Sequence, residues 1–327
     1  MRETRGRPAR PGVAVIGIGN WGSSLAHALR SARTPLKEVL TGLRAQGNAG
    51  SPSRTIARRG ASSPPSRLPL VALADARLDA EILWLCVPDS AIAEVARRLV
   101  LRARQLDSSG QPLRGRIVVH SSGALAAAVL EPAARAGASI AAVHPVMTFP
   151  THTPVALSGV FFGIEAETAV RRKLFALVRE LGGRPFAIAA SGKAFYHIMG
   201  MLSSPLLVSL IAAAQDAGSL AGLAPGPSRR LIASISQATL KNAFSQGLPK
   251  SFSGPLARGD LAAIHLHLEA LAEHPMLANL YRSLALYSLE ALPGPGKEKV
   301  RCLLAASITR KRRGPDGGAP LHRAPHA

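Results

Sequence analysis

The stretch that most constrains the fold is VAVIGIGNWGSSLAHAL, at residues 13–29. Its four opening apolar residues predict a short buried strand, and the small and apolar residues of 23–32 predict a helix packed on a sheet. Between them lie three glycines in the spacing G-x-G-x-x-G, at Gly17, Gly19 and Gly22. A strand, a glycine turn and a helix in this order are typical of a loop that binds the phosphates of a dinucleotide.

Each glycine of this loop has its own expected role. Gly17 permits the tight turn, Gly19 lets the backbone approach a pyrophosphate, and Gly22 lets the helix pack closely on the strand. The N–H groups at the start of the helix, around Asn20 and Trp21, are then offered to the phosphates. The alternative interpretation is a purely structural turn, because glycines occur in many tight turns.

The end of the second predicted strand, residues 38–44, bears on which dinucleotide is bound. NAD sites usually place Asp or Glu about 20 residues past the loop, on the ribose 2′-hydroxyl. This chain has Arg44 there, and its next acid is Asp75. A guanidinium suits a 2′-phosphate, which a carboxylate would repel, so NADP is favoured and NAD is the second candidate. The alternative is that Arg44 and the arginines after it form only the solvated face of an insertion.

Strands and helices alternate up to residue 145. This pattern predicts an α/β fold, a doubly wound parallel Rossmann-like sheet over residues 12–145. Strands are expected at 70–75, 81–88, 116–124 and 139–145, and helices at 89–103, with Asp89 as N-cap, and 126–136. Residues 45–69 are rich in Gly, Ser and Pro and are predicted to form a loop insertion around one short helix.

The pattern changes after residue 145. Short strands are expected at 159–166 and 184–190 around a helix at 168–181, and the chain is mainly helical from Gly192. We expect 146–292 to be a mainly helical substrate and dimerisation domain, flanked by a disordered leader (1–11) and a disordered basic tail (293–327). The apolar run 198–214 is near the lower length for a membrane span, but its serines and its proline favour a buried helix at a domain or subunit interface.

The charge and cysteine content narrow the class of protein. The net charge is +21, but much of the excess lies in the leader, the insertion and the tail, and only 4% of the residues are aromatic. We therefore expect no specific nucleic-acid partner, although weak binding to polyanions fits this charge. Two cysteines give neither a disulfide framework nor a metal-binding spacing, and no signal peptide is visible, so a cytoplasmic protein is expected.

Several further motifs carry a resemblance: LWLCVPDSAIAEVA (83–96), VVHSSGA (118–124), AVHPVMTF (142–149) and GKAFYH (192–197). Over residues 13–275 the chain resembles an uncharacterised bacterial family with a Rossmann-like NAD(P)-binding domain and a C-terminal domain of unknown function. That family is similar to pyrroline-5-carboxylate reductase, the coenzyme F420-dependent NADP oxidoreductases and the 6-phosphogluconate dehydrogenase-like enzymes. The resemblance implies a C-terminal domain like that of 6-phosphogluconate dehydrogenase, often part of a homodimer.

Candidate site residues follow three of the predicted strands, because ligands of open α/β sheets lie beyond the carboxyl ends of the strands. Val87 and Pro88 end one strand and Ser121 the next, and all three are expected to contact the cofactor. Ser122 and His144 are expected to contact the substrate. The alternatives are that the serines form a capping turn and that His144 is a satisfied buried histidine.

Lys193 and His197 are the candidate catalytic residues. They are four positions apart, so they lie side by side on one helical face. Hydride transfer to a carbonyl or imine needs a proton donor beside the reacting centre, and either side chain can serve. Lys193 also resembles in position the lysine that related hydroxyacid dehydrogenases place at the start of their interdomain helix. The alternative is a solvated pair at a helix start.

Two further substrate contacts are expected in the helical part. Arg258 is placed to clamp an anionic group or to form a structural ion pair, and Ser204 stands where the family tends to read Ser-Asn. Here Pro205 follows, so the amide is missing and the helix should kink. Together these features predict an NADP-dependent oxidoreductase that transfers a hydride between the nicotinamide and a small carbonyl, hydroxy or imine substrate. The alternative is a non-catalytic NADP-binding sensor or scaffold.

Overall fold

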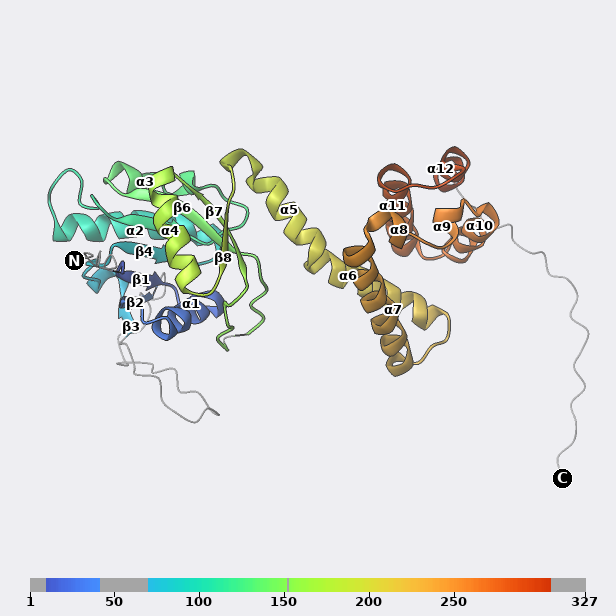
Figure 1. Ribbon diagram of the computed structural model, residues 1–327, viewed down its shortest axis with the longest axis horizontal. Helices are drawn as coiled ribbons and strands as arrows, with labels where there is room; N and C mark the ends of the chain where they lie inside the picture. Colours follow the sequence, from blue (N-terminus) through green and yellow to red (C-terminus); the bar gives the residue numbers. More distant parts are fainter. Residues whose placement is uncertain (1–9, 42–69, 152, 307–327) are drawn as a thin grey trace, which may run out of the picture. The chain divides into compact units, whose positions relative to one another are not determined.

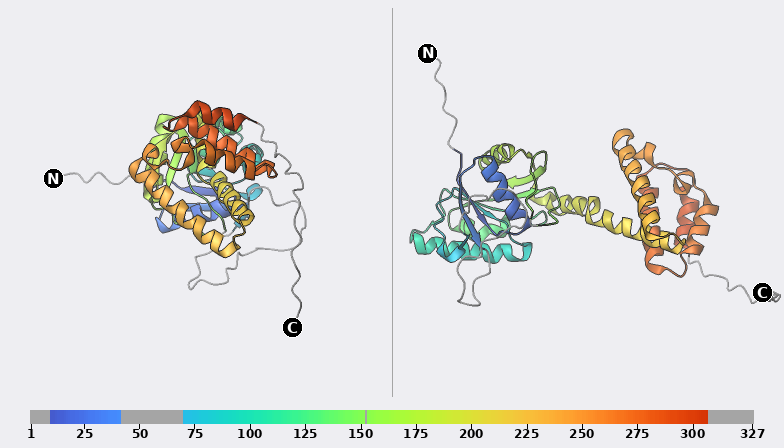
Figure 2. Two further views of the ribbon diagram at one scale, coloured as in Figure 1. Left: turned by 90° about the vertical axis from the view of Figure 1, so that its right-hand side faces the viewer. Right: turned by 90° about the horizontal axis from the view of Figure 1, so that it is seen from below.

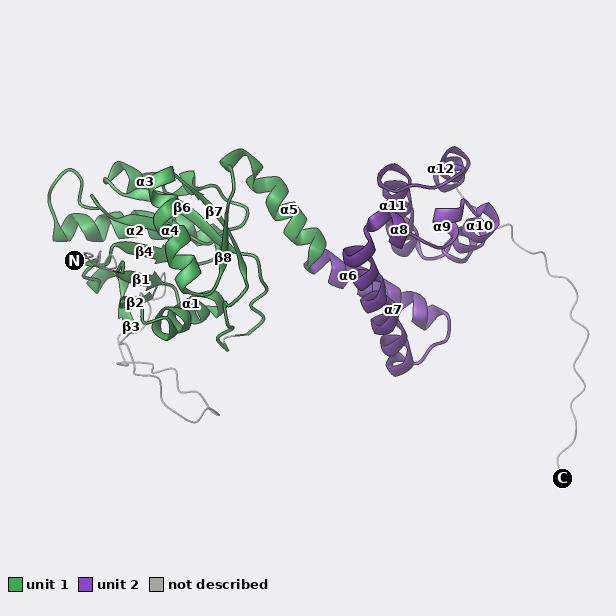
Figure 3. Ribbon diagram, in the orientation of Figure 1, with its two compact units in different colours: residues 1–204 green, residues 205–327 purple. Residues whose placement is uncertain are grey.

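The computed structural model describes residues 10–41, 70–151 and 153–306 (Figure 1). The chain forms two compact units, residues 1–204 and 205–327 (Figure 3). The first unit holds the sheet and the glycine loop, and the second is helical. Both the α/β class and the mainly helical C-terminal part are thus as the sequence predicts.

The first unit is built on an eight-stranded sheet with the order β3-β2-β1-β4-β5-β6-β7-β8. All neighbouring strands are parallel except β6 and β7. The carboxyl ends of β1, β4, β5 and β6 therefore meet at one edge, with the change of strand order between β1 and β4. The strands are β1 (Val13–Ile16), β2 (Leu36–Thr41), β3 (Leu70–Ala72), β4 (Ile82–Leu85), β5 (Ile117–His120), β6 (Ser139–Pro145), β7 (Phe161–Ala166) and β8 (Arg184–Ala187).

Helices cover both faces of this sheet (Figure 2, right). Helices α2 (Asp89–Leu106) and α3 (Glu131–Arg135) pack on one face, and α1 (Asn20–Ser31) and α4 (Thr168–Glu180) pack on the other. Successive residues of a strand point to opposite faces, so Ile16 belongs to the first core and Val15 to the second. Burial on both faces explains why the central strands are continuously apolar.

Some local predictions were wrong. Asp89 is not the N-cap of α2 but its first helical residue, because Pro88 occupies the cap position. The strand expected at 70–75 ends at Ala72 and continues as a 3-10 turn, Leu73–Asp75. The helix expected at 126–136 is divided into a 3-10 turn, Ala127–Leu130, and the short α3. The insertion 45–69 lies outside the described residues.

The first unit also extends further than the predicted boundary at residue 145. Strand β7 pairs antiparallel with β6, with His144 opposite Gly163, and β8 continues the sheet beyond β7. The change in sequence pattern at 145 thus marks a reversal of strand direction within one sheet. The compact unit runs on through α5 (Lys193–Ser203) to Ser204.

The second unit consists of helices α6 to α12. Its core is formed by Ile264, Leu268, Ala285, Leu289, Val300 and Leu304. The last two belong to α12, so residues 297–305 are not the disordered tail that composition predicted; residues 307–327 lie outside the described part. The helices are α6 (Pro205–Leu220), α7 (Pro225–Gln246), α8 (Leu248–Ser251), α9 (Pro255–Arg258), α10 (Leu261–Ala270), α11 (Pro275–Ala291) and α12 (Lys297–Ala305).

Helices α5 and α6 are separate, as the predicted kink requires. Ser204 interrupts the helix with φ −134° and ψ −84°, immediately before Pro205. Lys193 is the buried residue of α5, and α6 has none, so the expected burial of residues 198–214 at a domain or subunit interface stays a prediction. Among the described residues, one helical stretch, Ala190–Leu220, is long and apolar enough to cross a membrane.

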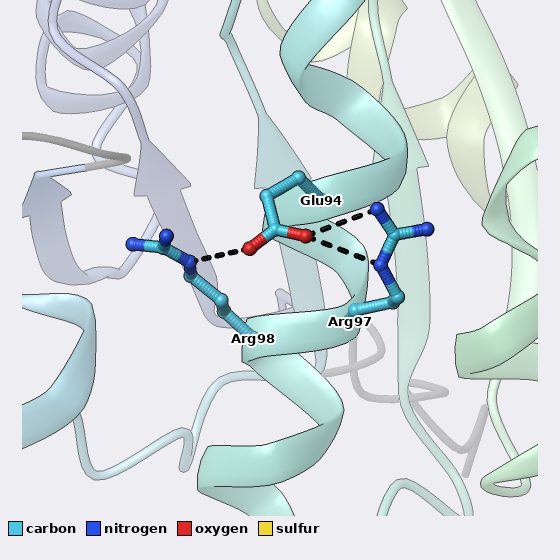
Figure 4. A network of polar contacts seen from close by, with 3 residues as sticks. All are labelled: Glu94, Arg97 and Arg98. Atoms are coloured by element: carbon cyan, nitrogen blue, oxygen red, sulfur yellow. Dashed lines mark hydrogen bonds and ion pairs between the residues drawn. The ribbon is translucent and has the colours of Figure 1, made fainter.

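The outer face of α2 carries a small network of charges. Glu94 accepts hydrogen bonds from Arg97 and Arg98, three and four residues further along the helix (Figure 4). The guanidinium of Arg98, and then that of Arg97, lowers the pKa of this carboxyl. Exposed pairs of this kind stabilise a fold little, so the network is a solvated face rather than a site.

Candidate functional site

The glycine loop follows β1 and has one open position. Gly17 has φ +101°, and a Cβ there would lie 2.5 Å from the carbonyl oxygen of Cys86. A Cβ on Gly22 would collide with the carbonyl oxygen of Gly17. A Cβ on Gly19, in contrast, would meet nothing within 4 Å among the described residues. Packing therefore requires Gly17 and Gly22, whereas Gly19 borders open space.

Helix α1 begins at the end of this loop with unpaired N–H groups. Gly19 is its N-cap and has no side chain with which to cap it. The first N–H groups of a helix have no carbonyl partner within the helix, and they carry its positive end. The side chain of Asn20 is turned aside and donates to the carbonyl oxygen of Phe149 at 2.7 Å. The loop can therefore bind an anion through its backbone N–H groups.

The side chains of Trp21 and Ser121, both predicted to contact the cofactor, are engaged with the protein itself. The indole N–H of Trp21 donates to the Ser121 hydroxyl oxygen at 2.7 Å, and that of Trp84 donates to the same oxygen at 2.8 Å. The Trp21 ring packs on Phe149 and Phe162, with centroids 5.1 and 6.2 Å away. Both residues are half-buried, so their predicted contacts with a cofactor stay predictions.

The chain after β5 forms a tightly bonded turn. Ser122 is buried, and its hydroxyl donates to Oδ2 of Asp89 at 2.7 Å. The same hydroxyl oxygen accepts from the N–H groups of Ala124 and Leu125 at 3.2 and 2.9 Å. The capping turn, which was the alternative interpretation of the serines, is thus formed. The partner role of Asp89 was missed, because the sequence separates it from Ser122 by a whole helix and strand.

His120 is a buried neutral histidine beneath this turn. Its Nδ1 accepts from the Ser122 N–H at 3.1 Å, so Nε2 carries the proton and donates to the Ala126 carbonyl at 3.2 Å. Burial, followed by the charge of Lys193, lowers the pKa of His120 to about 4. Both nitrogens are satisfied only in the neutral form.

Lys193 opens α5 and reaches back to the same turn. It is only 2% exposed, and its ammonium donates to the Ser122 carbonyl oxygen at 2.9 Å. Burial lowers the pKa of Lys193, against the opposing effects of the Glu165 and Asp89 carboxylates. The amine therefore lies at the carboxyl end of β5 and does not point into solvent.

Both His197 and His144 lie against Gly123, the next residue of the turn. A Cβ on Gly123 would come within 2.9 Å of His197 Cδ2 and of His144 Nε2. The structure thus brings together Lys193, His197 and His144 at the Ser122–Gly123 turn. These are three of the side chains that sequence patterns singled out.

Tyr196 is a site residue that the sequence analysis missed. Its hydroxyl lies 2.7 Å from His144 Nδ1, and a Cβ on Gly163 would come within 2.9 Å of it. Burial raises the pKa of Tyr196 to about 12, while burial and then the Lys193 charge lower that of His144 to about 4. The signal was its position three residues after Lys193, which places both on one helical face.

The other predicted site residues lie on other elements of the chain or outside the described part. Ser204 follows the 11-residue α5, so it lies roughly 16 Å along the helix from Lys193. Arg258 is an exposed residue of the second unit, at the end of α9. Val87 and Pro88 follow β4, next to the glycine loop, where Pro88 is exposed. Arg44 lies outside the described residues.

The neutral buried histidines predict acid sensitivity. An unfolded histidine titrates near pH 6.5, so between about pH 6.5 and 4 the unfolded chain binds protons that folded His120 and His144 do not. The free energy of unfolding should therefore fall as the pH is lowered through this range, by about 3 kcal/mol for His120 and by less for the partly exposed His144.

Urea unfolding followed by circular dichroism at a series of pH values measures this effect. His120→Gln should flatten the dependence, and His27→Gln, at an exposed position of α1, should leave it unchanged. An unfolding free energy independent of pH over this range would contradict the assignment of neutral buried histidines.

Two family matches agree with this architecture. Residues 2–145 match a Rossmann-like domain, and residues 160–288 match a domain of unknown function, DUF2520. The class defined by fold and family is thus an α/β protein with a Rossmann-like domain. In this chain, the part that matches this domain is followed by a part that is similar to DUF2520. No match was found among curated protein sequences.

Solved structures share the fold at low sequence identity. A candidate NADP oxidoreductase from Bacteroides fragilis is 20% identical, with a TM-score of 0.61 over 85% of this chain and 97% of that one. Pyrroline carboxylate reductase from Plasmodium falciparum, with NADP bound, is 16% identical, with a TM-score of 0.52 over 91% and 99%. An imine reductase from Myxococcus stipitatus, in complex with NADP+, is 16% identical, with a TM-score of 0.54 over 85% and 92%.

Proposed function

We propose that the protein is an NADP-dependent oxidoreductase that transfers a hydride between the nicotinamide and a small carbonyl, hydroxy or imine substrate. One observation carries the proposal: the open position at Gly19 and the buried Lys193 amine lie at the carboxyl ends of β1 and β5, two strands of one sheet with β4 between them. That edge is where ligands of such sheets bind.

The residues present fit a dinucleotide. The loop from Gly17 to Gly22 leaves room for a pyrophosphate at Gly19, and the N-terminus of α1 supplies N–H donors. Val87, Pro88 and the backbone of Ser121 border the position of the nicotinamide end in this proposal. NADPH supplies the hydride when it is bound.

Lys193 is the proposed proton donor. One of its N–H groups is held by the Ser122 carbonyl, and two remain for a substrate atom. Burial lowers the pKa of Lys193, which makes the ammonium a stronger acid, whereas burial raises that of Tyr196 to about 12. Lysine is therefore the better donor of the two near neutral pH. His197 orients it, and neutral His144 faces the substrate. Ser122 contributes its carbonyl oxygen, which holds the lysine, and Arg258 is a proposed contact to an anionic group.

Two of the structures that share the fold support this proposal, since their names describe a reductase holding NADP. The alternative, a sensor or scaffold without turnover, needs the glycine loop but not a lysine buried at the end of β5. NADPH absorbance measured with a panel of small ketones, keto esters and cyclic imines distinguishes the enzyme from the sensor or scaffold. We expect oxidation of NADPH with at least one class. Tight NADPH binding without turnover across the panel would favour the sensor.

Cofactor preference gives a separate prediction. If Arg44 binds the 2′-phosphate, NADP should bind about 10- to 150-fold more tightly than NAD, which corresponds to one charge-assisted hydrogen bond. Arg44→Ala should remove that preference, and Arg58→Ala, within the same basic segment, is the matched control. Calorimetric titration with both cofactors measures it. Equal affinities in the unaltered protein would contradict the role of Arg44.

We also propose a cytoplasmic homodimer, formed through the apolar surface of α6 and α7. Helix α6 has no buried residue, and in α7 the buried residue is Ser228. An open groove of about 420 Å³, lined mainly by apolar side chains of α6, α7, α10 and α11, lies on this unit. Large apolar side chains left in water cost about 1.5–3 kcal/mol each, which a second copy of the chain would recover.

The dimer is tested by charge substitution at matched positions. Leu231 on α7 and Leu101 on α2 are both 59% exposed. Leu231→Glu should shift the protein toward monomer in light scattering coupled to size-exclusion chromatography, whereas Leu101→Glu should not. A monomer at all concentrations in the unaltered protein would contradict the dimer. A protein that leaves the membrane fraction only with detergent would contradict the cytoplasmic assignment.

A further inference from the structure

The Ser121 hydroxyl joins two parts of the proposed site. Its oxygen accepts the indole N–H of Trp21 at 2.7 Å and that of Trp84 at 2.8 Å, so both lone pairs are used. Groups from α1 and β4 thus converge on one oxygen that follows β5.

One side of this junction is the glycine loop. Trp21 is the second residue of α1, directly after Asn20, and it lies between Gly19 and Gly22. Its ring is also held by Trp84 and Phe149, with centroids 6.2 and 5.1 Å away. A displacement of the first turn of α1 therefore moves the indole N–H relative to Ser121.

The other side is the turn that holds the lysine. Ser121 is covalently followed by Ser122, whose carbonyl oxygen accepts from Lys193 and whose hydroxyl binds Asp89. The amides of Ala124 and Leu125 are bonded to that hydroxyl. A displacement of Ser121 therefore passes directly to the group that positions the Lys193 amine.

We propose that Ser121 is a positioning residue, whose hydroxyl couples the glycine loop to the Ser122–Leu125 turn so that occupation of the loop orders the turn that holds Lys193. This role rests on the proposed function, since it links the expected phosphate site to the expected proton donor.

The coupling can be measured by amide hydrogen exchange, with 2′-phospho-ADP-ribose as the probe. This molecule has the phosphates of NADP but no nicotinamide ring to touch the turn. In the unaltered protein, the probe should slow exchange both in peptides spanning 17–25 and in those spanning 120–126. In Ser121→Ala it should slow exchange in the first set alone, and Ser121→Thr, which keeps the hydroxyl, should restore the response of the turn.

Two further variants separate coupling from general destabilisation. Thr34 is buried, and its hydroxyl has no hydrogen-bond partner among the described residues, so Thr34→Val removes a buried hydroxyl without breaking the junction. It should leave both responses intact. Trp21→Phe keeps an aromatic ring, although a smaller one, and removes the indole N–H. It should repeat the loss of response seen in Ser121→Ala, and it tests the coupling even if Ser121→Ala does not fold.

The outcomes distinguish this proposal from the proposed function. A turn that still responds to the probe in both Ser121→Ala and Trp21→Phe overturns the coupling, whether or not the protein is an enzyme. If the probe does not bind the unaltered protein, the dinucleotide site itself is wrong. In that case, exchange measured without ligand still tests the coupling through Ser121. Ser121→Ala should speed exchange about tenfold or more in both peptide sets. Faster exchange in peptides spanning 120–126 alone would overturn the coupling.

Discussion

Replacing Gly19 by valine is expected to abolish NADP binding while the thermal transition of the ligand-free protein stays nearly unchanged. The position borders open space, because a Cβ there meets no atom of the described residues within 4 Å, but a side chain fills the room that a pyrophosphate needs against the backbone. Loss of the backbone contacts to the phosphates should reduce affinity by at least about 100-fold, the worth of two hydrogen bonds to a charged group. Calorimetric titration and thermal melting measure the two effects.

Gly22→Val is the matched comparison, because it introduces the same side chain into the same loop. There the Cβ would collide with the Gly17 carbonyl oxygen, so this variant should lose stability as well as binding. If Gly19→Val instead unfolds the protein, the loop serves the fold first. If Gly19→Val binds NADP normally, the pyrophosphate does not lie at this loop.

Lys193→Met is expected to reduce turnover by about 100- to 10,000-fold, the usual contribution of a positioned acid or base. NADP affinity should be unchanged, because the Lys193 amine is bonded to the Ser122 carbonyl and not to the glycine loop. Methionine keeps most of the volume of the buried stem, so the fold should tolerate it. NADPH absorbance with the best substrate of the panel measures the rate.

Three further variants serve as controls and comparisons for Lys193→Met. Lys173→Met removes an exposed lysine of α4 that pairs with Glu81, and it should not affect turnover. His197→Ala should cost less than Lys193→Met if the histidine only orients the lysine. Tyr196→Phe should also cost less. A larger loss in Tyr196→Phe than in Lys193→Met would transfer the role of proton donor to the tyrosine.

The sequence predicted the sheet well and the side-chain network poorly. The bounds of β1 and β6 were predicted correctly, because a strand buried on both faces is a short apolar run between clear turn signals. The bond from Trp21 to Ser121 joins residues 100 positions apart, and that from Lys193 to Ser122 joins residues 71 apart. Such pairs depend on strand order, which local patterns do not specify.

In the helical part, the sequence prediction failed for a different reason. Its charged and Pro/Gly-rich end predicted disorder, but α12 is held by two buried side chains, Val300 and Leu304, on a partner core supplied by α10 and α11. Composition averages over such a stretch and conceals two apolar residues four positions apart. Tertiary packing outweighed the local signal there.

The placement of the tryptophans has a consequence for how unfolding is followed. The chain has two, Trp21 and Trp84, and both lie in the first unit, whereas Tyr281 and Tyr287 lie in the second. Tryptophan emission therefore follows the melting of the sheet alone and is blind to the helical unit. If emission and helical circular dichroism give the same midpoint, the two units unfold as one cooperative body; separate midpoints mean that each has a stability of its own.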